Sequence, residues 1–546
     1  MSRATSPDSP GSPGSPVLRD GAPVAAALLI LAAAIVASAW LSDDAYITFR
    51  TVDNFTSGEG LRWNVAERVQ SYTHPLWMFA ISAGYLVSGE VYYTSLILSF
   101  ACSLTALWIV AYRVAATPRL ALLAITPLLL SKAFVDYSTS GLENPLTHLA
   151  LALFFWAFSE SMDDPRKTST TAAARGLRLA LAAALIGLNR LDVLLLIGPA
   201  IALFLSSNGR WRSTSVLGAF LLGLTPLIAW EIFSLLYYGF PFPNTAYAKL
   251  ATGIPRPDLA AQGLRYLGES LTRDPVTLVA VAAGFACAFL AAPEVRAKRI
   301  AVVAGIPFYL LYLIWVGGDF MSGRLLTAPL CCAAISLSLA VALTRPAILA
   351  CLASAFALAL SAGLPTLTSG PEYGNEDPGA ERELWHGIGD ERAAYYPHTG
   401  LLRRWLGLAR AEDHVWALRG QAARNAGLTW AKGQALGLYG FYAGPRVHIM
   451  DMVGLSDPLL ARIPARPLWR IGHFERKVPQ GYVDTLRSGS NRIADPDLSI
   501  YYDALSLLVR DPVLDSDRLV AIGRFNLGAF DQHLEQYRAR QAETPR

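Results

Sequence analysis

Charged residues are scarce in this chain. Of 546 residues, 16% are charged and 53% are hydrophobic, whereas a soluble globular protein carries about 25% charged residues. The deficit is concentrated in the first two thirds, so the sequence predicts a polytopic membrane protein rather than one with a single anchor. The net charge of +4 is small for this length, and we expect no nucleic-acid partner.

Several common site motifs are also missing. The five cysteines all fall in apolar segments, so they predict neither a disulfide framework nor a CxxC metal site. No GxGxxG follows a predicted strand and no Walker loop occurs, so we expect no nucleotide-binding fold. Without a His/Cys cluster we assign no metal ligands. Mg²⁺ or Ca²⁺ between acidic residues is the only cofactor left open.

Apolar runs supply the candidate membrane helices, each of which needs about 20 apolar residues. We expect 11 or 12 spans, because 174–206 reads as a pair broken around "NRLD". Residues 1–21, rich in Ser, Pro and Gly, are expected to form a disordered cytoplasmic tail, followed by a retained first helix rather than a signal peptide. The candidate spans are 22–41, 74–88, 93–111, 119–134, 144–159, 174–188, 192–206, 214–236, 275–293, 299–316, 325–343 and 346–363.

Basic loops set the expected orientation in the cytoplasmic membrane. With "DPRKTSTTAAARGLR", "NGRWR" and "EVRAKR" inside, the first loop (42–73), the loop 237–274 and "GGDFMSGR" lie outside. Counting from the N-terminus disagrees with this between residues 88 and 144, where either one segment is re-entrant or one apolar run forms two short helices.

The composition changes at about residue 364. We predict a transmembrane domain over 22–363 and a separate extracytoplasmic α/β cap domain over 364–546. Within the cap, "RVHIMDMVGL" is typical of a short strand and "LLRRWLGLARAEDHVWALRG" of a helix.

Four groups of charged residues lie at predicted outer helix ends or loops. They are "SDDAYITFRTVDNFTSGEGLRWNVAERVQ", "DYSTSGLENP", "YYGFPFPNTAYAKL" and "GGDFMSGRLL". Charges near a bilayer usually pair or line a water-filled cavity. Each group alone is explained by pairing at the membrane surface, but four on one side favour the wall of one cavity.

The residue types in these groups suit transfer of a phosphate-linked group. Lys249, Arg50 and Arg324 are able to hold a phosphate or diphosphate. Asp43 or Asp44 is able to take a proton as general base, and repulsion between neighbouring carboxylates raises one pKa. A lipid phosphate, a cation for it and a carboxylate beside it predict glycosyl transfer from a polyprenyl-phosphate sugar.

Five blocks of sequence, in order, resemble a known family. They are "DDAYITFRTVDNFTSGEGLRWNVAERVQSYTHPLW", "TSGLENPL", "YYGFPFPNTAYAK", "GGDFMSGRLLTAPL" and "MVGLSDPLLARIP" with "IGHFERKVP". The acidic first loop is similar to that of the GT-C class of polytopic glycosyltransferases. The whole set resembles the mycobacterial terminal β-(1→2)-arabinofuranosyltransferases and their wider bacterial relatives. His74 is a departure, since the resemblance leads us to expect small hydroxyl side chains there.

The resemblance implies a GT-C membrane domain with an outer cap, a decaprenyl-phosphate arabinofuranose donor and an arabinan acceptor in the cell envelope. It implies that Asp43 and Asp44 are the essential acids and that Asp319 and Arg324 lie near the donor. Donor and product are both β-linked in the family, which implies net retention, by an enzyme nucleophile or by front-face attack. Neighbouring side chains often point apart, so only one aspartate need reach the anomeric carbon.

The remaining candidate residues each carry a structural alternative. For Glu67 and Arg68 it is folding of the loop, and for Glu143 it is the first-turn acid that a helix dipole favours. Lys249 either binds donor phosphate or extends to lipid headgroups. Asp319 and Arg324 either contact substrate or pair with each other. His473 and Lys477 are candidates for acceptor or donor contact.

Three other functions stay open. One is a GT-C transferase for another polyprenyl-phosphate sugar. Another is a transporter or flippase of lipid-linked sugar, which favours mid-membrane polar residues and inverted repeats. The third is a non-catalytic envelope scaffold, which would not depend on the aspartate pair.

Overall fold

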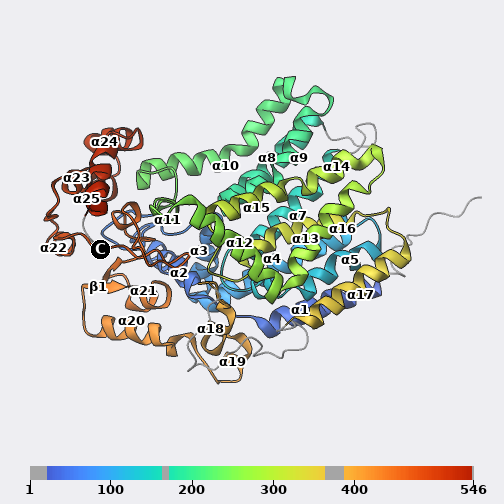
Figure 1. Ribbon diagram of the computed structural model, residues 1–546, viewed down its shortest axis with the longest axis horizontal. Coiled ribbons are helices and arrows are strands. Elements are labelled where there is room, and N and C mark those ends of the chain that lie inside the picture. Colours follow the sequence, from blue (N-terminus) through green and yellow to red (C-terminus); the bar gives the residue numbers. More distant parts are fainter. Residues whose placement is uncertain (1–20, 163–170, 363–385, 434, 544–546) are drawn as a thin grey trace, which may run out of the picture.

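The computed structural model describes residues 21–162, 171–362, 386–433 and 435–543. Most of the predicted N-terminal tail and the first part of the predicted cap lie outside these ranges. The described chain is mainly helical, with an elongated helical body at one end and the C-terminal region at the other (Figure 1).

The part before residue 363 forms seventeen α-helices within the described ranges. They are α1 (Ala22–Ser38), α2 (Asp43–Thr56), α3 (Pro75–Ser88), α4 (Val91–Ile109), α5 (Pro118–Leu130), α6 (Lys132–Asp136), α7 (Asn144–Ser161), α8 (Ala172–Asn189), α9 (Leu194–Ser206), α10 (Thr214–Tyr238), α11 (Asn244–Leu250), α12 (Arg256–Arg273), α13 (Pro275–Phe289), α14 (Pro293–Val303), α15 (Gly305–Val316), α16 (Thr327–Ser338) and α17 (Arg345–Ser361).

Every predicted membrane segment falls on a helix, and the predicted break at "NRLD" is present between α8 and α9. By length and composition, five helices of the described residues are able to cross a membrane, or up to seven if each of two bent pairs is one span. The five are Val91–Val114, Ala172–Asn189, Leu191–Arg212, Thr214–Tyr238 and Pro293–Val316. The chain is therefore a multi-pass membrane protein.

The predicted count of 11 or 12 spans exceeds this number for a physical reason. Four further apolar helices, α3, α5, α17 and the segment Arg324–Ser338, have only 10–17 residues, and a straight span needs about 20. The two bent pairs lie at α1 and α2 (81°) and at α12 and α13 (104°). Between residues 88 and 144, the predicted run 119–134 is divided at Ser131 into two short helices, α5 and α6.

Helix α2 turns away from α1 at the end of the first apolar run. Ser42 caps its first turn by accepting a hydrogen bond from the amide of Ala45 at 3.2 Å. Its 14 residues include Asp43, Asp44, Arg50 and Asp53. Because this density of charge is unfavourable in lipid, we treat α2 as lying outside the membrane-spanning segments.

The described C-terminal region contains eight helices and one small sheet. These are α18 (Glu391–Thr399), α19 (Leu401–Trp405), α20 (Val415–Asn425), α21 (Gly437–Ala443), α22 (Tyr482–Ser488), α23 (Pro496–Arg510), α24 (Ser516–Asn526), α25 (Asp531–Glu543), and strands β1 (Trp430–Gly433) and β2 (His448–Asp451). The strands pair in parallel, with Trp430 opposite His448.

The predicted strand in "RVHIMDMVGL" is confirmed by β2. The predicted helix in "LLRRWLGLARAEDHVWALRG" is wrong as one element, because α19 ends at Trp405 and α20 begins only at Val415. Gly407 takes a positive φ of 69° in the turn between them, a conformation that glycine adopts without a Cβ clash. The expected α/β mixture is mostly α in the described residues.

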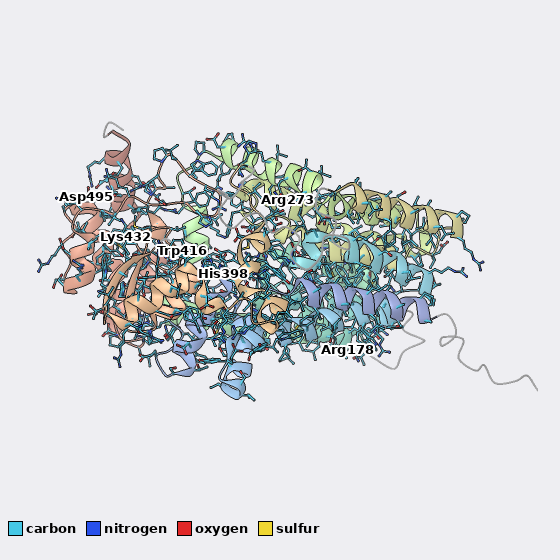
Figure 2. The ribbon with its side chains drawn as sticks, turned by 90° about the horizontal axis from the view of Figure 1, so that it is seen from below. Arg178, Arg273, His398, Trp416, Lys432 and Asp495 are labelled. Atoms are coloured by element: carbon cyan, nitrogen blue, oxygen red, sulfur yellow. The ribbon has the colours of Figure 1, made fainter. Side chains whose placement is uncertain are left out.

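Helix α2 joins the helical body to the C-terminal region, where it packs against α21. The contact is so close that a Cβ on Gly437 would clash with the backbone of Asp43. Only glycine therefore fits at that position. Figure 2 places Trp416, Lys432 and Asp495 at the C-terminal end of the molecule and Arg178 toward the opposite end. The packing of α2 against α21 fixes the first turn of α2 between the helical body and the C-terminal region.

Candidate functional site

A cavity of about 800 Å³ lies where the helical body meets the C-terminal region. Its polar wall includes Asp44 from α2, Lys249 from α11 and Arg324 from the turn after α15. Its apolar wall includes Leu191 and Leu195 on the span Leu191–Arg212, whose side chains are 36% and 39% exposed. The cavity therefore extends from a charged pocket to helices that face lipid.

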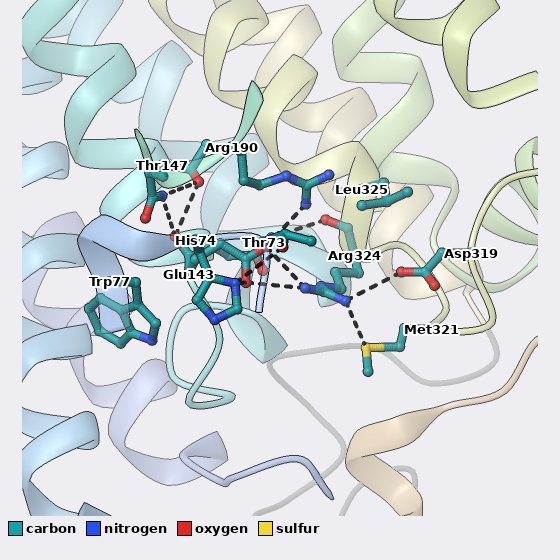
Figure 3. A network of polar contacts seen from close by, with 12 residues as sticks. Thr73, His74, Trp77, Glu143, Thr147, Arg190, Asp319, Met321, Arg324 and Leu325 are labelled. Atoms are coloured by element: carbon teal, nitrogen blue, oxygen red, sulfur yellow. Dashed lines mark hydrogen bonds and ion pairs between the residues drawn. The ribbon is translucent and has the colours of Figure 1, made fainter. Parts of the chain in front are cut away.

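Glu143 is the centre of a buried network at the wall of this cavity (Figure 3). Its carboxylate accepts two hydrogen bonds from Arg324, at 3.0 and 3.1 Å, and one from Arg190 at 3.2 Å. Nδ1 of His74 lies 3.3 Å from the same carboxylate. Burial alone would raise the pKa of Glu143, but Arg324, His74 and Arg190 together hold it well below its usual range.

His74 is neutral at pH 7, because burial lowers its pKa to about 4. A neutral imidazole has one donor and one acceptor nitrogen. With Nδ1 donating to Glu143, Nε2 accepts from the hydroxyl of Thr48 at 2.9 Å. The contact between His74 and Glu143 is thus a hydrogen bond, and the positive charge of the network comes from Arg190 and Arg324.

The turn after α15 presents Asp319 and Arg324 to the cavity. Gly318 adopts a positive φ of 76° there, and a Cβ would clash with Tyr266 at 2.5 Å, so the turn requires glycine. Arg324 lies 3.7 Å from Asp319 and bonds Glu143, yet its buried Nε has no hydrogen-bond partner among the described residues. A buried guanidinium with a spare donor suits an anionic ligand.

The two adjacent aspartates of α2 have different surroundings. Asp43 accepts hydrogen bonds from the amides of Gly437 (3.1 Å) and Leu438 (2.8 Å), and so docks the start of α21. Asp44 lines the larger cavity, and its side-chain carboxylate accepts no hydrogen bond from any described residue. Consecutive helical residues differ by about 100° in direction, which explains why only one of the two reaches the cavity.

Burial raises the pKa of both carboxyl groups. It reaches about 6 for Asp43, where repulsion from Asp44 adds to burial and the amides of α21 oppose it. For Asp44 burial raises the pKa, while the positive charges of Arg324 and Lys249 lower it in part. Asp44 is thus a carboxylate at the cavity wall that has no hydrogen-bond donor among the described residues, and burial raises its pKa.

A second cavity, of about 280 Å³, adjoins the first. Asp44, Lys249 and Leu455 line both cavities. Ile47 and Gly472 also line both, and the rest of the second cavity is lined by the C-terminal region, Phe320 and Asp43. Asp44 therefore stands at the junction of a membrane-side space and a space under the C-terminal region.

Six predicted site residues line these two cavities in addition to Asp43. They are Asp44, Glu143, Lys249, Asp319, Arg324 and His473. The side-chain ammonium of Lys249 makes no ion pair or hydrogen bond with any described residue. The ring of His473 packs edge-on against Phe320, with ring centroids 4.5 Å apart.

Arg50 does not line either cavity, contrary to its predicted role at a phosphate. It is buried, stacks over Trp63 at 4.3 Å, and donates to the carbonyls of Trp63, Gly440 and Val447 at 2.6–2.8 Å. A guanidinium that donates from each of its three nitrogens to a backbone carbonyl fixes the fold. It ties α2 to the C-terminal region.

Glu67 and Arg68 also lie away from the cavities. Glu67 pairs with Arg510 at 2.7 Å, and Arg68 donates to the carbonyls of Tyr237 and Leu508. These contacts support the alternative weighed for them, folding of the loop. Lys477 is exposed and lines neither cavity.

Arg190, Asp192 and His74 were not among the predicted site residues, although all three line the larger cavity. Asp192 accepts a hydrogen bond from Arg190 Nε at 3.0 Å. The signal was available in "NRLD", because opposite charges inside an apolar stretch usually mark a paired or functional site. Interpreting "NRLD" only as a break between two helices missed the charged pair of Arg190 and Asp192 at the cavity wall.

Metal ligation finds little support in the arrangement. The described residues contain no group of three or more His, Cys, Asp or Glu side chains placed to hold a metal ion. Glu143 and Asp192 are already paired with arginine.

Two curated proteins are similar to this chain. The terminal β-(1→2)-arabinofuranosyltransferase of Mycobacterium tuberculosis is 31% identical over 327 residues, which cover 54% of this chain and 51% of that protein. The protein of the same name from Corynebacterium glutamicum is 30% identical over 337 residues, covering 53% and 46%. The resemblance predicted from the sequence blocks is confirmed. The chain spans about half the length of the curated relatives it matches.

The chain was also compared with protein-family models and with solved structures. No family model matches the chain. Among solved structures, ArnT from Cupriavidus metallidurans bound to undecaprenyl phosphate aligns with a TM-score of 0.47 and 15% identity, covering 80% of this chain and 76% of that one.

Proposed function

We propose that this protein is a GT-C membrane glycosyltransferase that moves a sugar from a polyprenyl-phosphate donor to a glycan of the cell envelope. The observation that carries the proposal is the unpartnered Asp44 carboxylate at the junction of two cavities, beside Lys249 and Arg324. The similarity to the two arabinofuranosyltransferases supports arabinofuranose as the sugar.

The larger cavity suits the donor. Lys249 and the guanidinium of Arg324, which line this cavity, are the cations for its phosphate. The exposed leucines of the span Leu191–Arg212 offer an apolar path for the polyprenyl chain. A phosphate held at a cationic wall leaves more readily, because its developing negative charge is already compensated.

Asp44 acts as the base in this proposal. The acceptor hydroxyl oxygen bonds to the anomeric carbon, the bond from that carbon to the phosphate oxygen breaks, and polyprenyl phosphate leaves with the electron pair. The hydroxyl proton passes to Asp44. Because Asp43 is held by α21, the pair does not supply both nucleophile and base, and retention is explained better by front-face attack.

In the cell we place the protein in the cytoplasmic membrane, with the site and the C-terminal cap on the extracytoplasmic side. This placement is supported by the basic loops assigned to the cytoplasm. It also fits a lipid-linked donor and an envelope glycan acceptor.

The test is a transfer assay on the purified full chain in lipid vesicles. Synthetic polyprenyl phosphates bearing arabinofuranose, mannose or aminoarabinose are offered with an arabinofuranose oligosaccharide, and the product is followed by mass spectrometry. We expect arabinofuranose transfer that is lost in Asp44→Asn. Transfer of another sugar would replace the sugar assignment, and no transfer from any donor would contradict the enzyme assignment.

A further inference from the structure

The smaller cavity has a composition unlike that of the larger one. None of the five helices able to cross the membrane contributes to it. Its walls come from α2, α11, α18 and α20, from Phe320, and from the chain before α21, after β2 and around His473. A ligand in this space therefore approaches from water rather than from lipid.

Its lining combines aromatic rings with polar side chains. Phe320, Tyr395 and Trp416 supply the rings, and Glu391 and His473 supply polar groups at the same wall. Sugars present apolar C–H faces rimmed by hydroxyl groups, so rings flanked by hydrogen-bonding groups are the chemistry that recognises them.

Trp416 is the residue best placed to stack on a sugar ring. It is half-buried on α20, and the guanidinium of Arg419 lies over its ring at 4.8 Å. The ring also packs against the hydrophobic core, and Trp416 lines the cavity. A half-buried, braced indole is pre-organised, which reduces the entropy lost on binding.

The connection to the larger cavity fixes the direction of the ligand. Asp44 lines both spaces, so a hydroxyl at the inner end of a ligand in the smaller cavity meets the same carboxylate as a donor in the larger one. A cavity of about 280 Å³ is at the small end of ligand pockets, which suits the end of a glycan chain rather than its whole length.

We infer that the smaller cavity is the acceptor subsite, which takes the non-reducing end of an uncharged, water-soluble glycan with Trp416 stacked on its terminal ring and Asp44 at its reactive hydroxyl. This inference rests on the proposed function and adds the location and chemistry of the acceptor. Trp416 is assigned to acceptor binding alone, since it does not line the larger cavity.

The test separates acceptor from donor. Trp416→Ala in the reconstituted full chain is expected to raise the KM for a synthetic arabinofuranose oligosaccharide by about tenfold or more, with no rise in the KM for polyprenyl-phosphate arabinofuranose. Trp416→Phe, which keeps an aromatic ring, is expected to have an acceptor KM between those of the wild type and Trp416→Ala. The matched control is Trp405→Ala, because Trp405 is 60% exposed and lines neither cavity.

A binding measurement keeps this inference testable if transfer is not observed. Saturation-transfer difference NMR with the same oligosaccharide is expected to show signals for the wild type and for Trp405→Ala, and to lose them for Trp416→Ala. Binding without transfer would contradict the proposed reaction and leave the subsite standing. An unchanged acceptor KM in Trp416→Ala, a matching rise in donor KM, or no oligosaccharide binding by the wild type would overturn the subsite.

Discussion

The two parts of the first loop look alike in sequence but differ in structure. Both the first turn of α2 and the stretch from Arg50 to Arg68 are rich in charge. Of these two parts, the first turn reaches the cavities, with Asp44 lining both and Asp43 the smaller one, and the charges from Arg50 to Arg68 do not. The later charges are used to hold the C-terminal region, through carbonyls for Arg50 and through Arg510 for Glu67.

This difference shows how a structural charge is distinguished from a functional one. Each nitrogen of the Arg50 guanidinium donates to a backbone carbonyl, whereas Arg324 keeps a buried Nε without a partner among the described residues. Burial is common to both and decides nothing alone. Unused hydrogen-bonding capacity at a cavity wall is the feature that marks function.

Apart from the aspartate pair, the largest expected effect concerns Arg324. Arg324→Gln removes the cation next to the proposed donor phosphate, and we expect transfer to fall by about 10²–10³-fold. Glu143 keeps Arg190 as a partner, so the protein should still fold. The matched control is Arg178→Gln, an exposed arginine paired with Glu160 at the surface. Equal activity of the two variants would remove Arg324 from the donor site.

Arg50 is expected to give the opposite pattern. Arg50→Gln leaves the carbonyls of Gly440 and Val447 buried without a charged donor, and each such bond contributes about 1.5–3 kcal/mol. We therefore expect a large fall in thermal stability in detergent, with transfer per folded molecule near normal. A variant that keeps its melting temperature but loses transfer would show that Arg50 acts on substrate.

Glu143→Gln tests the centre of the network. The pKa of Glu143 is well below its ordinary value of 4.5, so its contribution to stability is present above pH 4.5 and is lost as pH falls toward the native pKa. We expect the variant to be less stable at pH 7 by about 3 kcal/mol. Its stability should also depend less on pH below 4.5 than that of the wild type. Glu160→Gln is the surface control, and a similar loss there would contradict the network.

The smallest expected effect is a shift in the pH–rate profile. Transfer should fall in acid as Asp44 is protonated, with a midpoint above 3.8 because burial raises its pKa. Lysine at position 249 lowers this pKa in part, so Lys249→Gln should move the acid limb to higher pH. Lys432→Gln, which changes an exposed lysine on β1, should leave the limb unmoved. An acid limb that does not respond to Lys249 would separate Lys249 from the base.

The sequence predicted the helices well because membrane segments are set by local apolar runs, and each candidate run lies on a helix. The cost of charge near a bilayer also singled out Asp44, Lys249, Asp319 and Arg324, which line the larger cavity. The contacts that tie Arg50 to the C-terminal region could not be predicted, because its partners lie about 400 residues away, at Gly440 and Val447. No local pattern carries that information.

The division of roles between the two aspartates has the same origin. The amides that bind Asp43 belong to Gly437 and Leu438, at a sequence separation of 394 and 395 residues. The small α21 helix must dock before one aspartate is held and the other is left free. Sequence alone could name the pair but not choose between its members.

The most direct test compares Asp43→Asn with Asp44→Asn in the same reconstituted transfer assay. We predict that Asp44→Asn lowers transfer by about 10²–10⁴-fold, the usual contribution of a general base, without loss of thermal stability. Asp43→Asn should lower thermal stability and retain measurable transfer, because it loosens α21 without removing the base. Normal transfer by Asp44→Asn, or abolished transfer by a stable Asp43→Asn, would contradict the assignment of Asp44 as the base.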